Sequence, residues 1–417
     1  MSLSIPRARI LDPASNAVFA VPAIAISLFV FAYSMIYGQK AVLLFYALWF
    51  PLLLLAPERM MVNRAPLLFI LALPALATIS VLWSDVPALT LRASIQYGTT
   101  VLCGLIAARV VSVRSLVAGA VLGGVVILQY SHSEGAYAYD FLDASYAMRG
   151  AFESKNQLGF YASLTAFLAL AYAVMSGTPF ILRPIALLIA GFAVWTLVLS
   201  DSATSAIALA AGLFTTLVVL GVTQIVVGAR AQIIVILLCI ALALAAIAAQ
   251  VGALDIIFEV FGKDPTLTGR TYLWNQGVLF GEERPFAGLG YYAFWIHNRP
   301  EAEDLWREFY ITGRTGFHFH NTLIESFVAL GILGVALVGA WMLALLVGTL
   351  RVVMNTGLRA EAAICAGLAV IFFIRSGVEI DFFTPYTVGS FLVPYIIVQM
   401  SDQRRAVLDA YTRTAVP

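Results

Sequence analysis

The chain has 417 residues, of which 61% are hydrophobic and 11% are charged, and its mean hydropathy is +0.93. A soluble domain needs more charge than this to cover its surface, so the balance is typical of a membrane protein. The net charge of +1 leaves no basic face and argues against a nucleic-acid partner. Cys103, Cys239 and Cys365 lie inside apolar runs, where cysteine acts as a small packing residue rather than as a metal ligand.

Apolar segments long enough to cross a bilayer as helices, about 20 residues each, follow one another along most of the chain. The first extends over about residues 17–37, too long for a signal-peptide core and without a cleavage site, so we interpret it as a span. We expect about twelve spans, centred near residues 27, 49, 74, 103, 122, 167, 190, 215, 241, 335, 369 and 393. The sequence therefore predicts an all-α polytopic membrane protein.

One interval between the expected spans is much longer than the others. Residues 252–319 combine charged, tyrosine, tryptophan and histidine side chains. We therefore divide the chain into spans 1–9 (residues 1–251), a large loop (252–319), spans 10–12 (320–400) and a tail (401–417).

The basic residues alternate between the two sides of this predicted topology. With a cytoplasmic N-terminus, thirteen arginines fall in inside segments and only four cations in the short outside loops. We therefore expect both termini in the cytoplasm and the large loop outside, on the same face as segment 131–156 and the 200–202 turn. No inverted repeat is evident, which weakens the alternative of a transporter such as a lipid-linked saccharide flippase.

The most distinctive local feature is Phe317-His318-Phe319-His320-Asn321, followed after nine residues by Gly331-Ile332-Leu333-Gly334. His320 lies where the large loop enters the tenth span, and a histidine there can act as a general base; the alternative is an interfacial histidine that only hydrogen-bonds the helix start. Gly331 and Gly334 share a helix face and would let a neighbouring helix approach closely. The His-x-His pair has no third ligand at a recognisable spacing, so we expect no metal.

This pattern resembles the signature of the O-antigen ligase and polysaccharide polymerase superfamily. The resemblance extends through Gly269–Trp274, Arg284–Gly290 and Glu153–Gly159, and Gly290–Trp295 looks most like the exopolysaccharide-polymerase branch. It covers about residues 150–335 most closely, and the order and spacing of the segments are more specific than any one of them.

The resemblance implies a glycosyltransferase-C-like fold in the bacterial inner membrane and transfer of a glycan from an undecaprenyl-diphosphate carrier to an acceptor saccharide on the outer face. The acceptor would be a growing chain or lipid A-core. Members of this kind are thought to invert the anomeric carbon without metal or another cofactor. His320 matches the proposed base, and Arg270 matches an arginine assigned to the diphosphate, for which a bidentate guanidinium is well suited. The alternative for Arg270 is a surface arginine.

One departure from the family pattern concerns a second phosphate-binding arginine. Ligases often carry it at the start of the eighth span, whereas residues 199–205 here read Leu-Ser-Asp-Ser-Ala-Thr-Ser. Lys155, Arg299 or Arg314 could supply the missing charge. This departure favours the polymerase branch over ligation to lipid A-core.

Further candidate residues lie in or near the large loop and at the end of the eleventh span. Arg375, at the end of the eleventh span, could bind substrate or form a structural ion pair with Glu379 at i+4. We expect His318 and Trp274 to contact substrate, although a tryptophan here could instead belong to the interfacial belt. Asn321, Glu325 and Glu379 are expected to support the substrate-contacting residues, and Glu325 could either orient the His320 ring or cap polar contacts. A non-catalytic assembly component is a further alternative.

Overall fold

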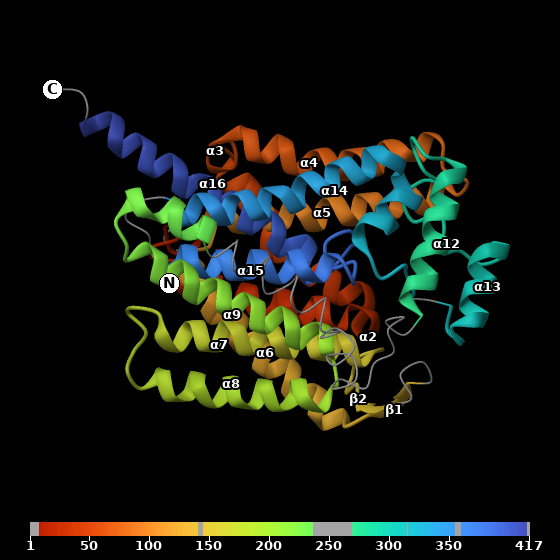
Figure 1. Ribbon diagram of the computed structural model, residues 1–417, viewed down its shortest axis with the longest axis horizontal. Coiled ribbons are helices and arrows are strands. Elements are labelled where there is room, and N and C mark those ends of the chain that lie inside the picture. The colour runs from red at the N-terminus through yellow and green to blue at the C-terminus, as the bar shows by residue number, and fades with distance from the viewer. Residues whose placement is uncertain (1–7, 141–144, 237–268, 315, 355–359, 415–417) are drawn as a thin grey trace, which may run out of the picture.

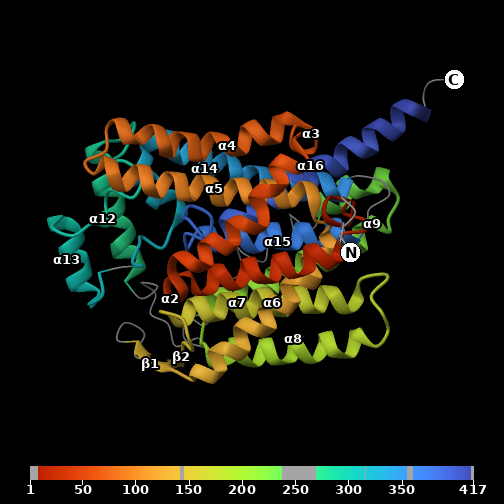
Figure 2. The same cartoon turned by 180° about the vertical axis from the view of Figure 1, so that it is seen from behind.

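The computed structural model describes residues 8–140, 145–236, 269–314, 316–354 and 360–414. Its long helices run roughly side by side in one bundle, with α12, α13 and a small β-hairpin at one end and the chain's C-terminus at the other (Figures 1 and 2). The helices include α1 (Ala8–Leu11), α2 (Ala17–Leu55), α3 (Pro57–Met60), α4 (Arg64–Ile79), η1 (Ser80–Leu82), α5 (Pro87–Val110), α6 (Val113–Glu134), α7 (Lys155–Val174), α8 (Leu182–Leu199), α9 (Ala203–Thr223), α12 (Arg270–Glu283), α13 (Pro300–Glu308), α14 (Thr322–Met354), α15 (Ala360–Ser376) and α16 (Val388–Thr414).

The fold is the expected all-α membrane architecture. Within the described residues, seven helices are long and apolar enough to cross a membrane: α2, α4 continued by η1, α6, α7, α8, α9 and α14. Several expose large apolar side chains, including Leu54, Leu68, Leu188, Phe214 and Leu343. Such surfaces are stable against lipid rather than water. The chain is therefore a multi-pass membrane protein.

Individual spans differ from their expected limits in informative ways. The first two expected spans form the single element α2, which is interrupted by non-helical backbone at Tyr33 and Gly38. Helix α15 has 17 residues, and the apolar part of α16 is limited to Val388–Asp402, so both are shorter than a full span. The expected span near residue 241 lies outside the described residues, so the total of about twelve stays a prediction.

The expected tail also has regular structure, because α16 continues as a helix to Thr414. The two strands, β1 (Tyr137–Asp140) and β2 (Ser145–Met148), pair antiparallel just after α6. The large predicted loop is structured where it is described: residues 269–319 contain α12 and α13. They pack around their own apolar cluster, which includes Leu273, Phe294, Trp306 and Phe319.

The glycine motif after His320 breaks helix α14 rather than admitting a neighbouring helix. Gly331 has φ +62°, and a Cβ there would lie 2.4–2.5 Å from the backbone of Phe286 and Ala287. The Ile332 N–H donates to the Pro285 carbonyl at 2.8 Å, and the Gly290 N–H donates to the Ala329 carbonyl at 2.9 Å. The expectation of close helix–helix contact at Gly331 was wrong. The close approach joins α14 to the loop after α12. The Gly331–Gly334 motif and the Arg284–Gly290 motif are therefore in direct backbone contact.

Candidate functional site

Asn321 fixes the position of His320 by capping the start of α14. Its side-chain oxygen accepts hydrogen bonds from the backbone N–H groups of Leu323 and Ile324, at 3.0 and 3.2 Å. These N–H groups have no partner within the helix, which is why Asn is favoured at this position. The Asn321 amide also donates to the Gly377 carbonyl at 2.9 Å. The start of α14 is thereby tied to the segment that follows α15.

His320 has an unusual backbone conformation that several contacts hold in place. Its φ is +49°, in the left-handed region that side chains other than Gly rarely adopt. The His320 N–H donates to Nδ1 of His318 at 3.1 Å, and its carbonyl accepts from Trp274 Nε1 at 3.3 Å. Strained residues that the surrounding structure holds in this way cluster at functional sites. The contact also gives Trp274 a positioning role toward His320.

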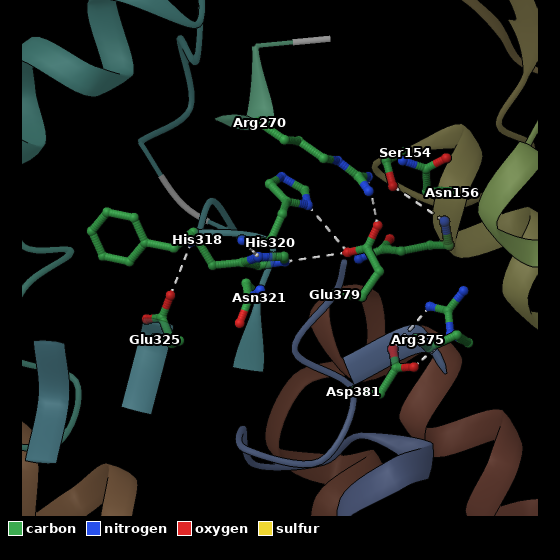
Figure 3. A network of polar contacts seen from close by, with 12 residues as sticks. Ser154, Asn156, Arg270, His318, His320, Asn321, Glu325, Arg375, Glu379 and Asp381 are labelled. Carbon is green, nitrogen blue, oxygen red and sulfur yellow. Dashed lines mark hydrogen bonds and ion pairs between the residues drawn. The ribbon is translucent and has the colours of Figure 1, made fainter. Parts of the chain in front are cut away.

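Glu379, in the loop after α15, is the residue on which the site converges (Figure 3). Its Oε2 lies 3.2 Å from Nδ1 of His320, and its Oε1 accepts from Nη2 of Arg270 at 2.9 Å. The carboxylate is only 8% exposed. Burial raises the pKa of Glu379, but the charge and hydrogen bond of His320, together with the Arg270 guanidinium, outweigh burial and hold the pKa well below its usual range.

These contacts determine which nitrogen of His320 is available for chemistry. Because the ionised carboxylate of Glu379 can only accept, Nδ1 of His320 carries a proton and donates it. In a neutral ring, Nε2 is then unprotonated, while the side chain remains 23% exposed. This is the arrangement in which a carboxylate orients an imidazole as a general base.

His318, His320 and Glu379 also place three potential metal ligands within 4.8 Å of one another. Sequence spacing did not indicate this grouping, because 59 residues separate His320 from Glu379. The hydrogen bonds oppose a cation here. Nδ1 of His318 accepts a backbone N–H, so its Nε2 carries the proton. A cation bound there would have to displace this proton and compete with Arg270 for Glu379.

Arg375 does not form the expected pair with Glu379, and that prediction was wrong. Its guanidinium instead makes a two-point contact with Asp381, in which Nη2 lies 2.9 Å from Oδ1, and also donates to Ser205 Oγ at 3.2 Å. The guanidinium carbon lies 4.0 Å from the centre of the Phe160 ring. Arg375 is 3% exposed. The i, i+4 rule failed because α15 ends at Ser376, so Glu379 is no longer on the helix.

The other cations proposed for the phosphate site divide into two groups. Lys155 lies at the first turn of α7 and pairs with Asp201 at 3.6 Å, in the segment from which the family arginine is missing. Arg375 reaches the same segment through Ser205. Arg299 instead pairs with Asp85 and Glu301, and Arg314 pairs with Glu303 at 3.0 Å. Of the three candidates for the missing charge, only Lys155 contacts the segment where that charge is expected; Arg375, a separate substrate-binding candidate, also contacts it.

The Glu325 side chain binds the backbone of the segment that carries His318 and His320, and it does not contact the His320 ring. Its carboxylate accepts the Phe319 N–H at 2.9 Å and lies 3.5 Å from Trp295 Nε1. Of the two roles expected for Glu325, these bonds fit the capping of polar contacts, whereas Glu379 is the carboxylate that contacts the His320 ring. The Phe319 contact nevertheless fixes the peptide between the two histidines.

The fold and the site define a multi-pass membrane protein with a histidine–carboxylate pair and an arginine at one end of its helical bundle. The family described as O-antigen ligase matches residues 185–339, which contain both Arg270 and His320. The chain is also 40% identical over 404 residues to the "Exopolysaccharide production protein ExoQ" of Rhizobium meliloti (strain 1021), covering 97% of this chain and 93% of the relative. The chain belongs to the O-antigen ligase family, near its exopolysaccharide branch, and is a glycan-transferring membrane enzyme of the ligase and polymerase type.

Proposed function

We propose that this protein extends an exopolysaccharide or O-antigen by transferring a glycan from an undecaprenyl-diphosphate carrier to the end of an acceptor saccharide. The observation that carries the proposal is the His320–Glu379–Arg270 arrangement, which combines a base with a cation at one end of the bundle. The name of the Rhizobium relative supports an exopolysaccharide product. Ligation to lipid A-core is the second candidate.

In the proposed reaction, Nε2 of His320 takes the proton of the acceptor hydroxyl while its oxygen attacks the anomeric carbon. The bond from that carbon to the carrier diphosphate breaks, and the diphosphate leaves with the bonding electrons. One displacement of this kind inverts the anomeric carbon. Glu379 stabilises the imidazolium that forms, and the step needs no metal.

Arg270 is suited to the leaving diphosphate because its guanidinium binds the same carboxylate, Glu379, as the proposed base. Its contact with Glu379 uses one of five N–H donors, and no other acceptor among the described residues engages the group. The remaining donors can neutralise charge on phosphate oxygens. Lys155 and Arg375 would add positive charge from the neighbouring segment.

The proposal places the protein in the bacterial inner membrane with both termini in the cytoplasm. The alternation of arginines along the sequence supports this orientation. The His320 site would then face the periplasm, where the outer leaflet presents the carrier-linked glycan.

The decisive experiment reconstitutes the full chain in proteoliposomes with a carrier-linked repeat unit and offers either a second repeat unit or lipid A-core. Extension of the repeat supports the polymerase, and capping of the core supports the ligase. His320→Ala should lower either rate by about 10²- to 10⁴-fold, the usual contribution of a general base. Full activity of that variant would refute the assignment of the base.

A further inference from the structure

Helices α4, α14 and α16 line an open cavity of about 500 Å³. These lining segments include the start of α4, and the junction of α3 and α4 lies at the end of the bundle opposite α12 and α13 (Figures 1 and 2). Its volume is within the roughly 300–1,000 Å³ of ligand pockets. The lining residues are Asn63, Ala65, Pro66, Phe69, Ala344, Gly348, Arg351, Ile397, Met400 and Ser401. Most are apolar or small; of the polar ones, Asn63 precedes α4, Arg351 lies in the last turn of α14 and Ser401 lies within α16.

Hydrogen bonds organise the polar rim of this cavity. Asp402 forms an ion pair with Arg109 and accepts from the Asn63 amide at 3.0 Å. The second Arg109 nitrogen donates to the Val62 carbonyl at 2.6 Å. The turn before α4 is therefore fixed to α5 and α16, and the rim is held in place by the fold.

Arg351 provides the positive charge of the cavity. It lies in the last turn of α14, is exposed, and forms no ion pair with any residue that the structure describes. The acid on the adjacent wall, Asp402, is already bound to Arg109 and Asn63. The cavity thus offers a cation at its rim and apolar walls along two candidate spans, α4 and α14.

We propose that this cavity binds an anionic phospholipid from the leaflet opposite the His320 site. The net negative charge of the head group would pair with Arg351, and an acyl chain would lie against Phe69, Ala344 and Ile397. Basic pockets between membrane helices commonly bind acidic head groups. A soluble anion would gain the charge contact but nothing from the apolar walls. The carrier-linked donor, in contrast, is expected at the other face.

The test measures lipids retained by the full chain. The protein is reconstituted in vesicles of equal parts phosphatidylglycerol and phosphatidylcholine, extracted in mild detergent, and analysed by native mass spectrometry. The wild type should retain phosphatidylglycerol preferentially. Arg351→Gln should lower that preference about five-fold, the effect of one basic residue near a membrane surface.

Two further variants make the result specific. Arg183→Gln removes an exposed arginine from α8, outside the cavity, and should leave the preference unchanged. Ala344→Phe fills the cavity while keeping Arg351, and should also lower retention. Equal retention of the two lipids by the wild type, or an unchanged preference in Arg351→Gln, would overturn the proposal. Displacement of phosphatidylglycerol by inorganic phosphate would do the same, because it would identify a site for soluble anions.

Discussion

Oε2 of Glu379 lies 3.2 Å from Nδ1 of His320, although 59 residues separate them in the chain. The contact joins the start of α14 to the loop that follows α15. Two other bonds reinforce this junction: Thr322 Oγ1 donates to the Glu379 carbonyl at 2.7 Å, and Asn321 donates to Gly377. The ring and its carboxylate are therefore held by the same pair of segments.

Glu379→Gln should lower the rate of glycan transfer by about 10²- to 10⁴-fold while leaving the folded protein intact. Glutamine keeps the shape of the side chain but lacks the negative charge that stabilises an imidazolium at His320. The measurement is turnover in proteoliposomes. Asp304→Asn, which makes the same charge change on the exposed surface of α13, serves as the control and should retain activity. Equal rates for both variants would remove Glu379 from the mechanism.

Stability should decrease on acidification because His318 is held neutral. Burial lowers its pKa well below 6.5, and the charge of His320 lowers it further, so below about pH 6.5 the unfolded chain binds a proton that the folded chain excludes. The free energy of unfolding then falls with decreasing pH, with a limiting slope of about 1.4 kcal/mol per unit. Thermal unfolding in detergent at a series of pH values from 7.5 to 5 measures this change of stability with pH.

His318→Asn removes the titrating group but keeps an acceptor for the His320 N–H, so the slope should become shallower. His297→Asn removes an exposed histidine and should leave the slope unchanged. If the wild type and His318→Asn lose stability in parallel, His318 is not the source of the acid sensitivity.

Arg375 and Asp381 should behave as a mutually dependent buried pair. Removing one partner leaves an uncompensated buried charge and should lower the free energy of unfolding by about 3–5 kcal/mol. The double variant Arg375→Met, Asp381→Leu should recover much of that stability. Denaturant unfolding of the two single variants and the double variant measures the coupling. Additive losses would show that the two side chains act independently. Recovery of stability without recovery of glycan transfer would assign Arg375 a role toward substrate as well.

Gly331→Ala should destabilise the protein by at least about 1 kcal/mol, because φ is +62° and the added Cβ meets the Phe286–Ala287 backbone. Gly339→Ala is the matched control. Gly339 lies in the same helix with nothing within 4 Å of the added Cβ, so alanine should be neutral or slightly stabilising. Thermal unfolding compares the two. Similar effects at both positions would mean that the break in α14 imposes no requirement for glycine.

Composition and hydropathy were sufficient to predict the membrane class, because lipid exposure demands long apolar helices whatever the details of packing. A break between the spans centred near residues 27 and 49 was also expected, and non-helical backbone occurs between them at Gly38. The helical interruption at Gly331 was not predicted, because a glycine pair in an apolar helix equally suits close helix packing. The predicted boundaries of the large loop, and its position outside the membrane, stay predictions.

Within the site, His320 and Arg270 were selected through their motif, and the structure connects both to Glu379. Glu379 was expected only as a supporting residue and a partner of Arg375. Its actual partners depend on where α15 ends and on a turn that brings distant segments together, neither of which a helical spacing rule contains. The assignment of Arg270 to the diphosphate, and of Lys155 and Arg375 to substrate binding, stays a prediction.

The left-handed backbone at position 320 limits which amino acids evolution can place there. Asparagine tolerates that backbone best among residues with a Cβ, but its amide is not a base. Histidine is the side chain whose ordinary pKa lies near neutrality, so few other residues could replace it at this position. Position 318 needs only an acceptor for one amide proton. Saturation mutagenesis followed by selection for polymer should therefore recover histidine alone at 320 and a mixture of residues at 318, so that the two histidines of one motif would differ sharply in mutational tolerance.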